Sequence, residues 1–269
     1  MRMDKWIFIF LPILLLTVIS SLVSLLNPDF YFRDSEIMAA KSHYLDLINL
    51  FIVVPAGLVL FFLVMKGSYW AKLSILGIMA YLAFMFGFNA LSLFFNKLFL
   101  VYIALFSLNI FGILFGYNNV RQSGTFPEDR FIIKVSAVLL MLFAVPVYFF
   151  WLIEVIASTV NNTVPETISN MNIPANVVHV FDMGFALPVI IYGSVLLLKG
   201  KNSGLVISAI MATFVFFICI SLLGMEVGLH RNNLHFDQGI LVSAIIMTPL
   251  SVFPLVTLSR AVSKYFPGT

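Results

Sequence analysis

The chain has 269 residues, of which 61% are hydrophobic and 10% are charged, and its net charge is +3. A soluble domain is about half apolar and a quarter charged, so these proportions exclude a water-soluble globular protein. The basic residues form no run interleaved with aromatic residues, which excludes a nucleic-acid-binding surface. The single cysteine, Cys219, excludes an internal disulfide and a thiolate metal cluster.

The apolar residues fall into blocks of about 20, the length that an α-helix needs to cross about 30 Å of hydrocarbon. We therefore predict an all-α, polytopic membrane helix bundle, with about eight transmembrane helices and no soluble domain. The predicted helices cover residues 6–26, 45–65, 73–91, 98–117, 131–157, 177–198, 204–225 and 238–262. The first block is longer than the apolar region of a signal peptide, and we interpret it as a retained helix.

Lysine and arginine are unevenly divided between the two sides of this layout. Those opposite the N-terminus are Arg33, Lys41, Lys97 and Arg231, and the other eleven of the fifteen lie on the N-terminal side. Because positively charged loops stay in the cytoplasm, both termini are predicted to be cytoplasmic. We expect the membrane to be a prokaryotic plasma membrane.

Transporters are often built from internal repeats, but no convincing match between the two four-helix halves is visible in the sequence. Proline interrupts five of the eight predicted helices. Such prolines indicate either ordinary kinks or broken helices that line a cavity.

Polar side chains gather on the predicted outer side. All four histidines fall there, namely His43, His179, His230 and His235. His179 and Asp182 are three residues apart, and Glu226 and His230 are four apart, so each pair shares a helix face. Asp46 and Asn49 form a third pair at the outer start of the second helix.

Depth distinguishes the polar residues further. Asp182 lies about 26 Å along the helix from Lys199, just beneath the outer hydrocarbon boundary, and Glu154 is placed similarly. A carboxylate at this depth costs about 1–3 kcal/mol unless it is paired, protonated or facing water, so Asp182 is the best single candidate. Asn109, near the middle of its helix, and Asn89 can hydrogen-bond between helices without any further role.

Three interpretations of the outer rim stay open. The favoured one is transport or sensing of a small solute or ion at an outward-facing polar site. The candidate residues for that site are Asp182, Glu154, His179, Glu226, Asn109 and Asn89.

The second interpretation is a membrane-embedded hydrolase or transferase with a divalent metal that activates water. Its candidate ligands are His179, Asp182, Glu226 and His230. The third is a scaffold or accessory subunit without a site of its own, which binds a membrane partner or forms a homo-oligomer.

Two short stretches carry a resemblance. Phe95-Asn96-Lys97-Leu98-Phe99-Leu100, and His179-Val180-Phe181-Asp182 followed by Pro188, resemble an uncharacterised prokaryotic family of multi-pass membrane proteins. The similarity covers the third to the seventh predicted helix and implies no activity. It implies that Asp182 and the turn at Asn96 belong to a recurring design.

Overall fold

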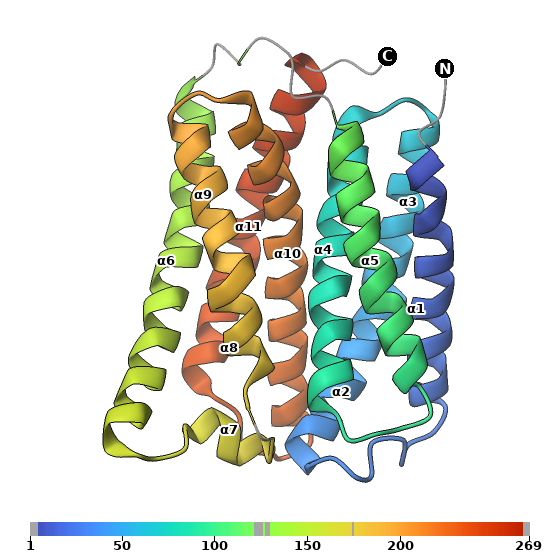
Figure 1. The fold of residues 1–269 in the computed structure, drawn as a ribbon, viewed down its shortest axis with the longest axis vertical. Coiled ribbons are helices and arrows are strands. Elements are labelled where there is room, and N and C mark those ends of the chain that lie inside the picture. The colour runs from blue at the N-terminus through green and yellow to red at the C-terminus, as the bar shows by residue number, and fades with distance from the viewer. Residues whose placement is uncertain (1–4, 121–125, 127–129, 174, 266–269) are drawn as a thin grey trace.

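The protein is a bundle of long helices joined by short turns (Figure 1). The structure, a computed structural model, describes residues 5–120, 126, 130–173 and 175–265. Within these ranges there is no strand, and eight helical segments are long and apolar enough to cross a membrane. The chain is therefore an all-helical multi-pass membrane protein, as its composition predicts.

We number the eight spans in chain order. Span 1 is the 3-10 helix η1 (Lys5–Ile9) with α1 (Phe10–Leu25), span 2 is α2 (Glu36–Ile48), the π-helix η2 (Asn49–Val53) and α3 (Val54–Met65), span 3 is α4 (Tyr69–Ser92), and span 4 is α5 (Phe99–Asn119). Span 5 is α6 (Arg130–Asn161), span 6 is α8 (Val177–Phe181), the π-helix η3 (Asp182–Ala186) and α9 (Leu187–Leu198), span 7 is α10 (Asn202–Arg231), and span 8 is α11 (Gln238–Tyr265). The short helix α7 (Glu166–Met171) lies between spans 5 and 6.

The two ends of the bundle differ. Helix α1 begins and α11 ends at the same end, which we call the terminal end (Figure 1). The opposite end, which we call the distal end, carries α7 and the turns between α1 and α2, α4 and α5, and α10 and α11. An even number of spans brings the first and last helices to one side in this way.

Span 2 begins at Glu36, well before residue 45, where hydropathy places its start. The reason is a polar N-terminal cap: the Ser35 side chain accepts a hydrogen bond from the Met38 N–H at 3.3 Å, and the acidic Glu36 occupies the first turn. The first two turns of α2 are therefore helical although they are not strongly apolar. This extension places Asp46 inside a helix, away from its start.

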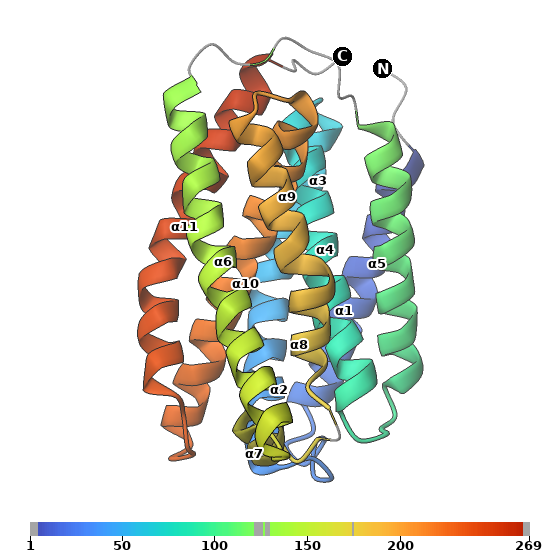
Figure 2. The ribbon, with the colours of Figure 1, turned by 60° about the vertical axis from the view of Figure 1, so that its left-hand side comes forward.

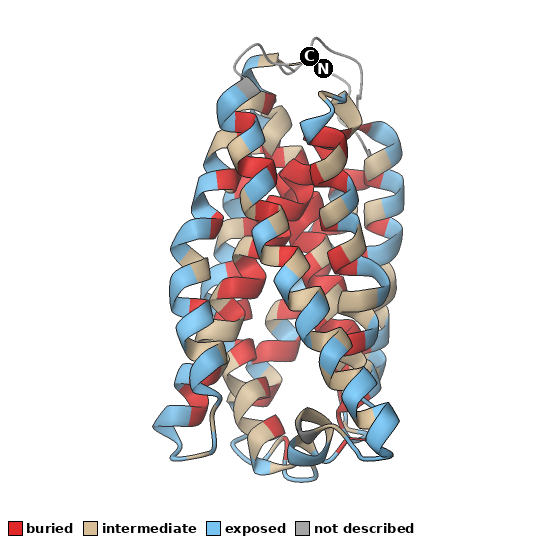
Figure 3. Ribbon diagram, turned by 90° about the vertical axis from the view of Figure 1, so that its left-hand side faces the viewer, coloured by how far each residue is buried: buried red, intermediate tan, exposed pale blue. Residues whose placement is uncertain are grey.

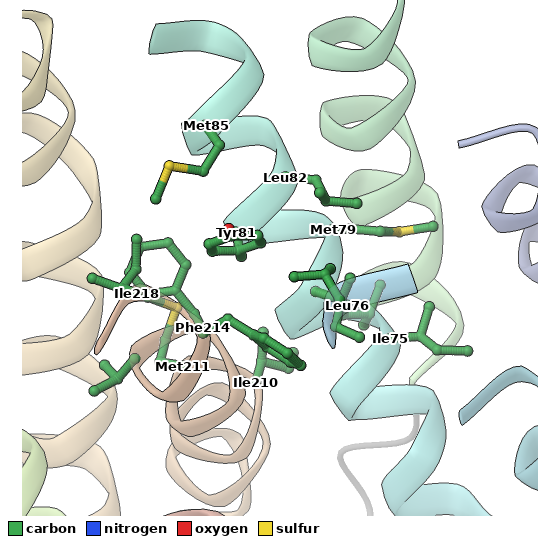
Figure 4. Packing of buried hydrophobic residues seen from close by; sticks show 14 of the residues in the cluster. Ile75, Leu76, Met79, Tyr81, Leu82, Met85, Ile210, Met211, Phe214 and Ile218 are labelled. Atoms are coloured by element: carbon green, nitrogen blue, oxygen red, sulfur yellow. The ribbon is translucent and has the colours of Figure 1, made fainter. Parts of the chain in front are cut away.

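Helices α4 and α10 form the centre of the bundle. Most of their residues are buried, whereas α6 and α11 leave most of theirs at the surface (Figure 3). Figure 4 shows Tyr81 of α4 facing Phe214 and Ile218 of α10. Gly77 allows the close approach, because a Cβ at that position would lie 2.5 Å from a backbone carbonyl oxygen of α10. Such tight packing stabilises helices in lipid, where apolar burial alone gives little advantage.

Spans 1–4 and spans 5–8 are arranged alike (Figures 1 and 2). In each half, the third span packs against the second and fourth, and the first packs against the second and fourth. Between the halves, α4 packs against α10, while α2 contacts α10 and α8 contacts α4. Because each half has four spans, both halves run in the same direction. The structure therefore contains an internal repeat that the amino-acid identities alone do not reveal.

The backbone of spans 2 and 6 makes the repeat specific. Each span contains a π-helix, and Pro55 or Pro188 follows directly as the second residue of the next α-helix. Proline has no N–H and its ring clashes with the carbonyl of the preceding turn, so a widened turn relieves the clash. In η2 and η3 the closing hydrogen bond runs back five residues to the carbonyl of Asn49 or Asp182.

Both spans also end in the same way. Gly67 and Gly200 adopt positive φ angles of 89° and 70° directly after a lysine, which ends α3 and α9 in similar turns. The same number of residues separates Asn49 from Asp182, Pro55 from Pro188 and Gly67 from Gly200. Spans 2 and 6 are thus equivalent elements in register.

Candidate functional site

Glu154 and His179, predicted separately as site residues, are paired in the structure. The His179 Nε2 atom lies 3.2 Å from Glu154 Oε2, which joins span 5 to span 6 near the distal end. The other carboxylate oxygen of Glu154 accepts a hydrogen bond from the Thr167 hydroxyl of α7 at 2.8 Å. The imidazole is buried although its span faces lipid elsewhere.

The same imidazole nitrogen has a second neighbour. Asn176 Nδ2 lies 3.2 Å from His179 Nε2, and the Asn176 side-chain oxygen accepts the Val178 N–H, which fixes the orientation of the amide. A protonated His179 therefore forms an ion pair with Glu154 through Nε2, whereas a neutral ring with a lone pair on Nε2 accepts a hydrogen bond from Asn176. His179 has a polar partner in both protonation states.

Trp151 connects this pair to Asp182. The indole Nε1–H donates to Asp182 Oδ2 at 2.9 Å, and the indole ring centre lies 4.5 Å from that of His179. The structure thus brings Glu154, His179 and Asp182, all predicted candidates, around one tryptophan. The three belong to α6, α8 and η3, so the group spans the contact between spans 5 and 6.

Glu226 lies elsewhere, at the contact between the two halves. Its carboxylate is 1% exposed, and Oε1 lies 3.4 Å from Lys41 Nζ of α2. The other oxygen, Oε2, accepts the Asp237 N–H at 3.3 Å. This ion pair connects span 2 to span 7 at the distal end and is separate from the Glu154 group.

The predicted metal ligands His179, Asp182, Glu226 and His230 do not form one group. His230 is exposed and its ring stacks edge-on against Phe236 at 5.0 Å. In the parts of the chain that the structure describes, no three His, Cys, Asp or Glu side chains lie close enough to hold a metal ion. The residues present therefore do not fit a divalent metal site of the kind the enzyme hypothesis requires.

Asn89 and Asn109 are buried but take no part in these groups. Asn109 Nδ2 donates to the Leu105 carbonyl of its own helix at 2.7 Å. The side-chain oxygens of both asparagines have no hydrogen-bond partner among the described residues. Neither amide reaches the Glu154 group through a hydrogen bond that the structure shows.

A second polar group surrounds Asp46 in span 2, which the sequence pairs with Asn49 but which is not among the predicted site residues. The carboxylate is 2% exposed and accepts hydrogen bonds from Ser21 at 3.2 Å, from Tyr31 at 2.7 Å, and from Ser24. Burial, followed by the charge of Asp46, raises the pKa of Tyr31 well above its ordinary value. The phenol therefore keeps its proton at physiological pH and acts as a donor to Asp46.

Asp46, like His179, has a partner both when it is ionised and when it is protonated. Ser24 Oγ lies within hydrogen-bond reach of both Asp46 Oδ2 and the Ser21 carbonyl oxygen, at 3.1 Å from the latter. With Asp46 ionised, Ser24 donates to it. With Asp46 protonated, the acid proton is donated to Ser24 Oγ, and the serine proton is donated to the Ser21 carbonyl. A proton can thus be bound without any change in the heavy-atom arrangement.

The Asp46 group and the Glu154 group occupy equivalent places in the repeat. Asp46 and His179 each stand three residues before the first residue of the π-helix. Each contacts a residue of the first span of its half: Asp46 contacts Ser21 and Ser24, and His179 contacts Glu154. The segment between the first and second spans adds a further hydrogen bond in each half. Tyr31 donates to Asp46 directly, and Thr167 donates to Glu154, the partner of His179. Both halves therefore place a titratable group at the same point of the same element.

A third network joins the halves at the centre. The Tyr81 hydroxyl of α4 donates to Asn49 Oδ1 at 2.9 Å, and it accepts from the Ser221 hydroxyl of α10 at 2.7 Å. Asn49 Nδ2 is buried and has no partner among the described residues.

One sequence signal could have identified the Asp46 group. Asp46 and Asn49 precede Pro55 at the same spacing at which His179 and Asp182 precede Pro188, so the polar positions and the proline match even though the residue types differ. No protein-family model, curated protein or solved structure matches this chain. The resemblance to an uncharacterised prokaryotic membrane protein family therefore stays a prediction.

Proposed function

We propose that the protein is a multi-pass transporter that couples the movement of a small solute or ion to protonation of Asp46 and of the Glu154–His179 pair. One observation carries the proposal: in both halves, at equivalent positions, a polar pair lies at the start of a π-helix that a proline follows. Interrupted helices at corresponding positions of two repeats are the usual location of transporter binding sites. Titratable side chains within spans are costly and mark pathways for ions and protons.

The geometry supports proton coupling in particular. Asp46 has hydrogen-bond partners in two protonation states, and His179 has an ion-pair partner when charged and a hydrogen-bond partner when neutral, so neither state leaves an unsatisfied charge. Both groups lie toward the distal end, where the Lys41–Glu226 pair connects span 2 to span 7. In the proposal this ion pair holds the two halves together at the distal end. Protonation of Asp46 and His179 then changes the relative stability of the closed and open arrangements of the halves.

The orientation is part of the proposal. The excess of lysine and arginine on the N-terminal side supports cytoplasmic termini in a prokaryotic plasma membrane. The distal end, with both titratable groups, then faces outward.

A pH jump on proteoliposomes adsorbed to a solid-supported membrane tests the proposal without knowledge of the solute. We expect a transient current from proton uptake, reduced several-fold in Asp46→Asn and His179→Gln and lost in the double variant. Glu36→Gln, which removes an exposed carboxylate at the same end, is the matched control and should leave the current unchanged. A wild-type current in the double variant would show that these groups do not take up the protons.

The second stage identifies the solute. Sodium, potassium, amino acids and sugars are added in turn while a pH gradient is imposed across the proteoliposomes. A transported solute gives a sustained current in place of a transient one. Proton uptake without sustained current for any solute would favour sensing over transport.

A further inference from the structure

A groove of about 910 Å³ opens at the terminal end between α3 and α11, on the opposite side of spans 3 and 7 from the titratable groups of span 6. Its walls are mainly apolar, with Pro55 and Val59 from α3 and Trp70 from α4. Two cations, Arg260 and Lys264, stand one turn apart at the α11 edge, and both are exposed. The groove has no part in the proton-binding groups described above.

The length of the groove matches one leaflet of a bilayer. Along α11 it runs from Leu255 to Lys264, a distance of about 14 Å at the helical rise, which is close to half of the ~30 Å hydrocarbon thickness. Its inner end is therefore near the middle of the membrane, and its outer end is at the level of the headgroups. An acyl chain lying along α11 would fill this depth.

The charges at the mouth are of one sign. The described residues that line the groove include no aspartate or glutamate, and no ion pair joins Arg260 or Lys264 to a carboxylate in the described part of the chain. The hydroxyls of Ser259 and Ser263 already donate to carbonyls of their own helix. Neither cation is thus neutralised by a carboxylate of the described chain at headgroup depth, where basic side chains attract anionic lipids; the Lys264 ammonium lies 5.2 Å from the Tyr265 ring centre.

We infer that this groove binds a phospholipid with an anionic headgroup from the leaflet at the terminal end, with an acyl chain between α3 and α11 and the headgroup at Arg260 and Lys264. The chemistry of the walls fits an acyl chain, and the charge at the mouth fits a phosphate-bearing anion. A zwitterionic lipid satisfies the apolar walls but gains less from the two cations.

Trp70, in the groove wall, provides a direct readout. In a variant with Trp6→Phe and Trp151→Phe, the remaining indole is Trp70, because the chain has three tryptophans. Its fluorescence is measured in bilayers with brominated phosphatidylglycerol or brominated phosphatidylcholine as the quencher. We expect the brominated anionic lipid to occupy the site with about thirtyfold higher apparent affinity, since each of the two basic residues contributes on the order of 1 kcal/mol.

Neutralising the mouth should abolish this preference. The pair Arg260→Gln with Lys264→Gln is expected to bring the ratio of the two affinities to about one. Lys199→Gln with Lys201→Gln, an equal loss of charge at the same end of the bundle, should leave it at about thirty. Equal loss of preference in both pairs would mean a general surface effect and would overturn the proposal.

A second pair of variants tests the apolar part. The phosphatidylglycerol that stays bound to the protein is measured by native mass spectrometry. Val59→Trp adds bulk to an exposed residue that lines the groove and should abolish this binding. Leu58→Trp adds the same bulk to the neighbouring exposed residue outside the groove and should retain the lipid. Retention of lipid by both variants, or a stable lipid-free dimer that cross-links through the thiol of a Val59→Cys variant, would refute the lipid site.

Discussion

Replacing Lys41 by methionine tests the contact between the halves, because it removes the cation that pairs with the buried Glu226. Glu226 is 1% exposed, so its ionised carboxylate would keep only the Asp237 N–H as a partner. Breaking a buried pair by removing one member costs about 3–5 kcal/mol. Since the Lys41 side chain is 25% exposed and partly solvated, we expect the lower value, about 3 kcal/mol.

The chain provides its own probe of unfolding. Cys219 is the single cysteine and is buried, so a thiol-reactive fluorogenic maleimide labels the protein in detergent only as it unfolds. At about 2–4 °C per kcal/mol for a chain of this size, Lys41→Met should lower the melting temperature by about 6–12 °C. Lys97→Met, which removes an exposed lysine at the same end, should change it by less than about 2 °C.

The double variant separates loss of the pair from loss of packing. Lys41→Met combined with Glu226→Gln removes both charges and should recover most of the loss, because no buried charge is left unpaired. If the double variant melts as low as Lys41→Met alone, the lysine stem and not its charge stabilises the contact. The interpretation of the pair as an electrostatic link between the halves would then be wrong.

Three further substitutions test the buried groups and the distal loop. Tyr31→Phe should destabilise the protein by about 1–2 kcal/mol, because the hydrogen bond from Tyr31 to Asp46 is lost. If Tyr31→Phe costs the same in a protein that already carries Asp46→Asn, the two residues are not coupled and the prediction is wrong. Gly77→Ala should cost about 1–3 kcal/mol because its Cβ would overlap a carbonyl of α10, whereas Gly184→Ala, with nothing within 4 Å, should not. Burial raises the pKa of Asp34, so its contribution to stability is fully present below pH of about 4 and is lost as the pH rises through the raised value. Melting curves of Asp34→Asn between pH 4 and 7 should therefore fall less steeply with pH than those of the wild type; an unchanged slope would contradict this.

The membrane architecture could be predicted because hydropathy reports it directly. Each span carries a block of apolar residues of bilayer length, and the turns between the blocks are rich in Gly, Asn and Lys. The pairing of Glu154 with His179 could be predicted only in part. Depth indicates that the Glu154 side chain turns inward, but the rotation of α6 relative to α8 decides which residue it meets.

Asp46 was underestimated for a specific reason. Hydropathy starts span 2 at residue 45, which puts Asp46 at a solvated rim, whereas the cap at Ser35 extends the helix and buries the carboxylate. The repeat was missed for a different reason. Its two copies share a π-helix, a proline and a glycine turn, while the side chains around them differ, as Asp46 and His179 do at equivalent positions.

A unit of four spans returns the chain to the side from which it started, so a second copy joined end to end inserts in the same orientation. The present arrangement is what fusion of a gene for a four-helix protein to its own duplicate would produce, with α4 and α10 at the former dimer contact. Such an origin leaves each half free to diverge, and this explains how one copy came to carry an acid and the other an imidazole at the same place. Two separate polypeptides, divided between Val120 and Arg130, should then find each other in the membrane and restore the complete bundle.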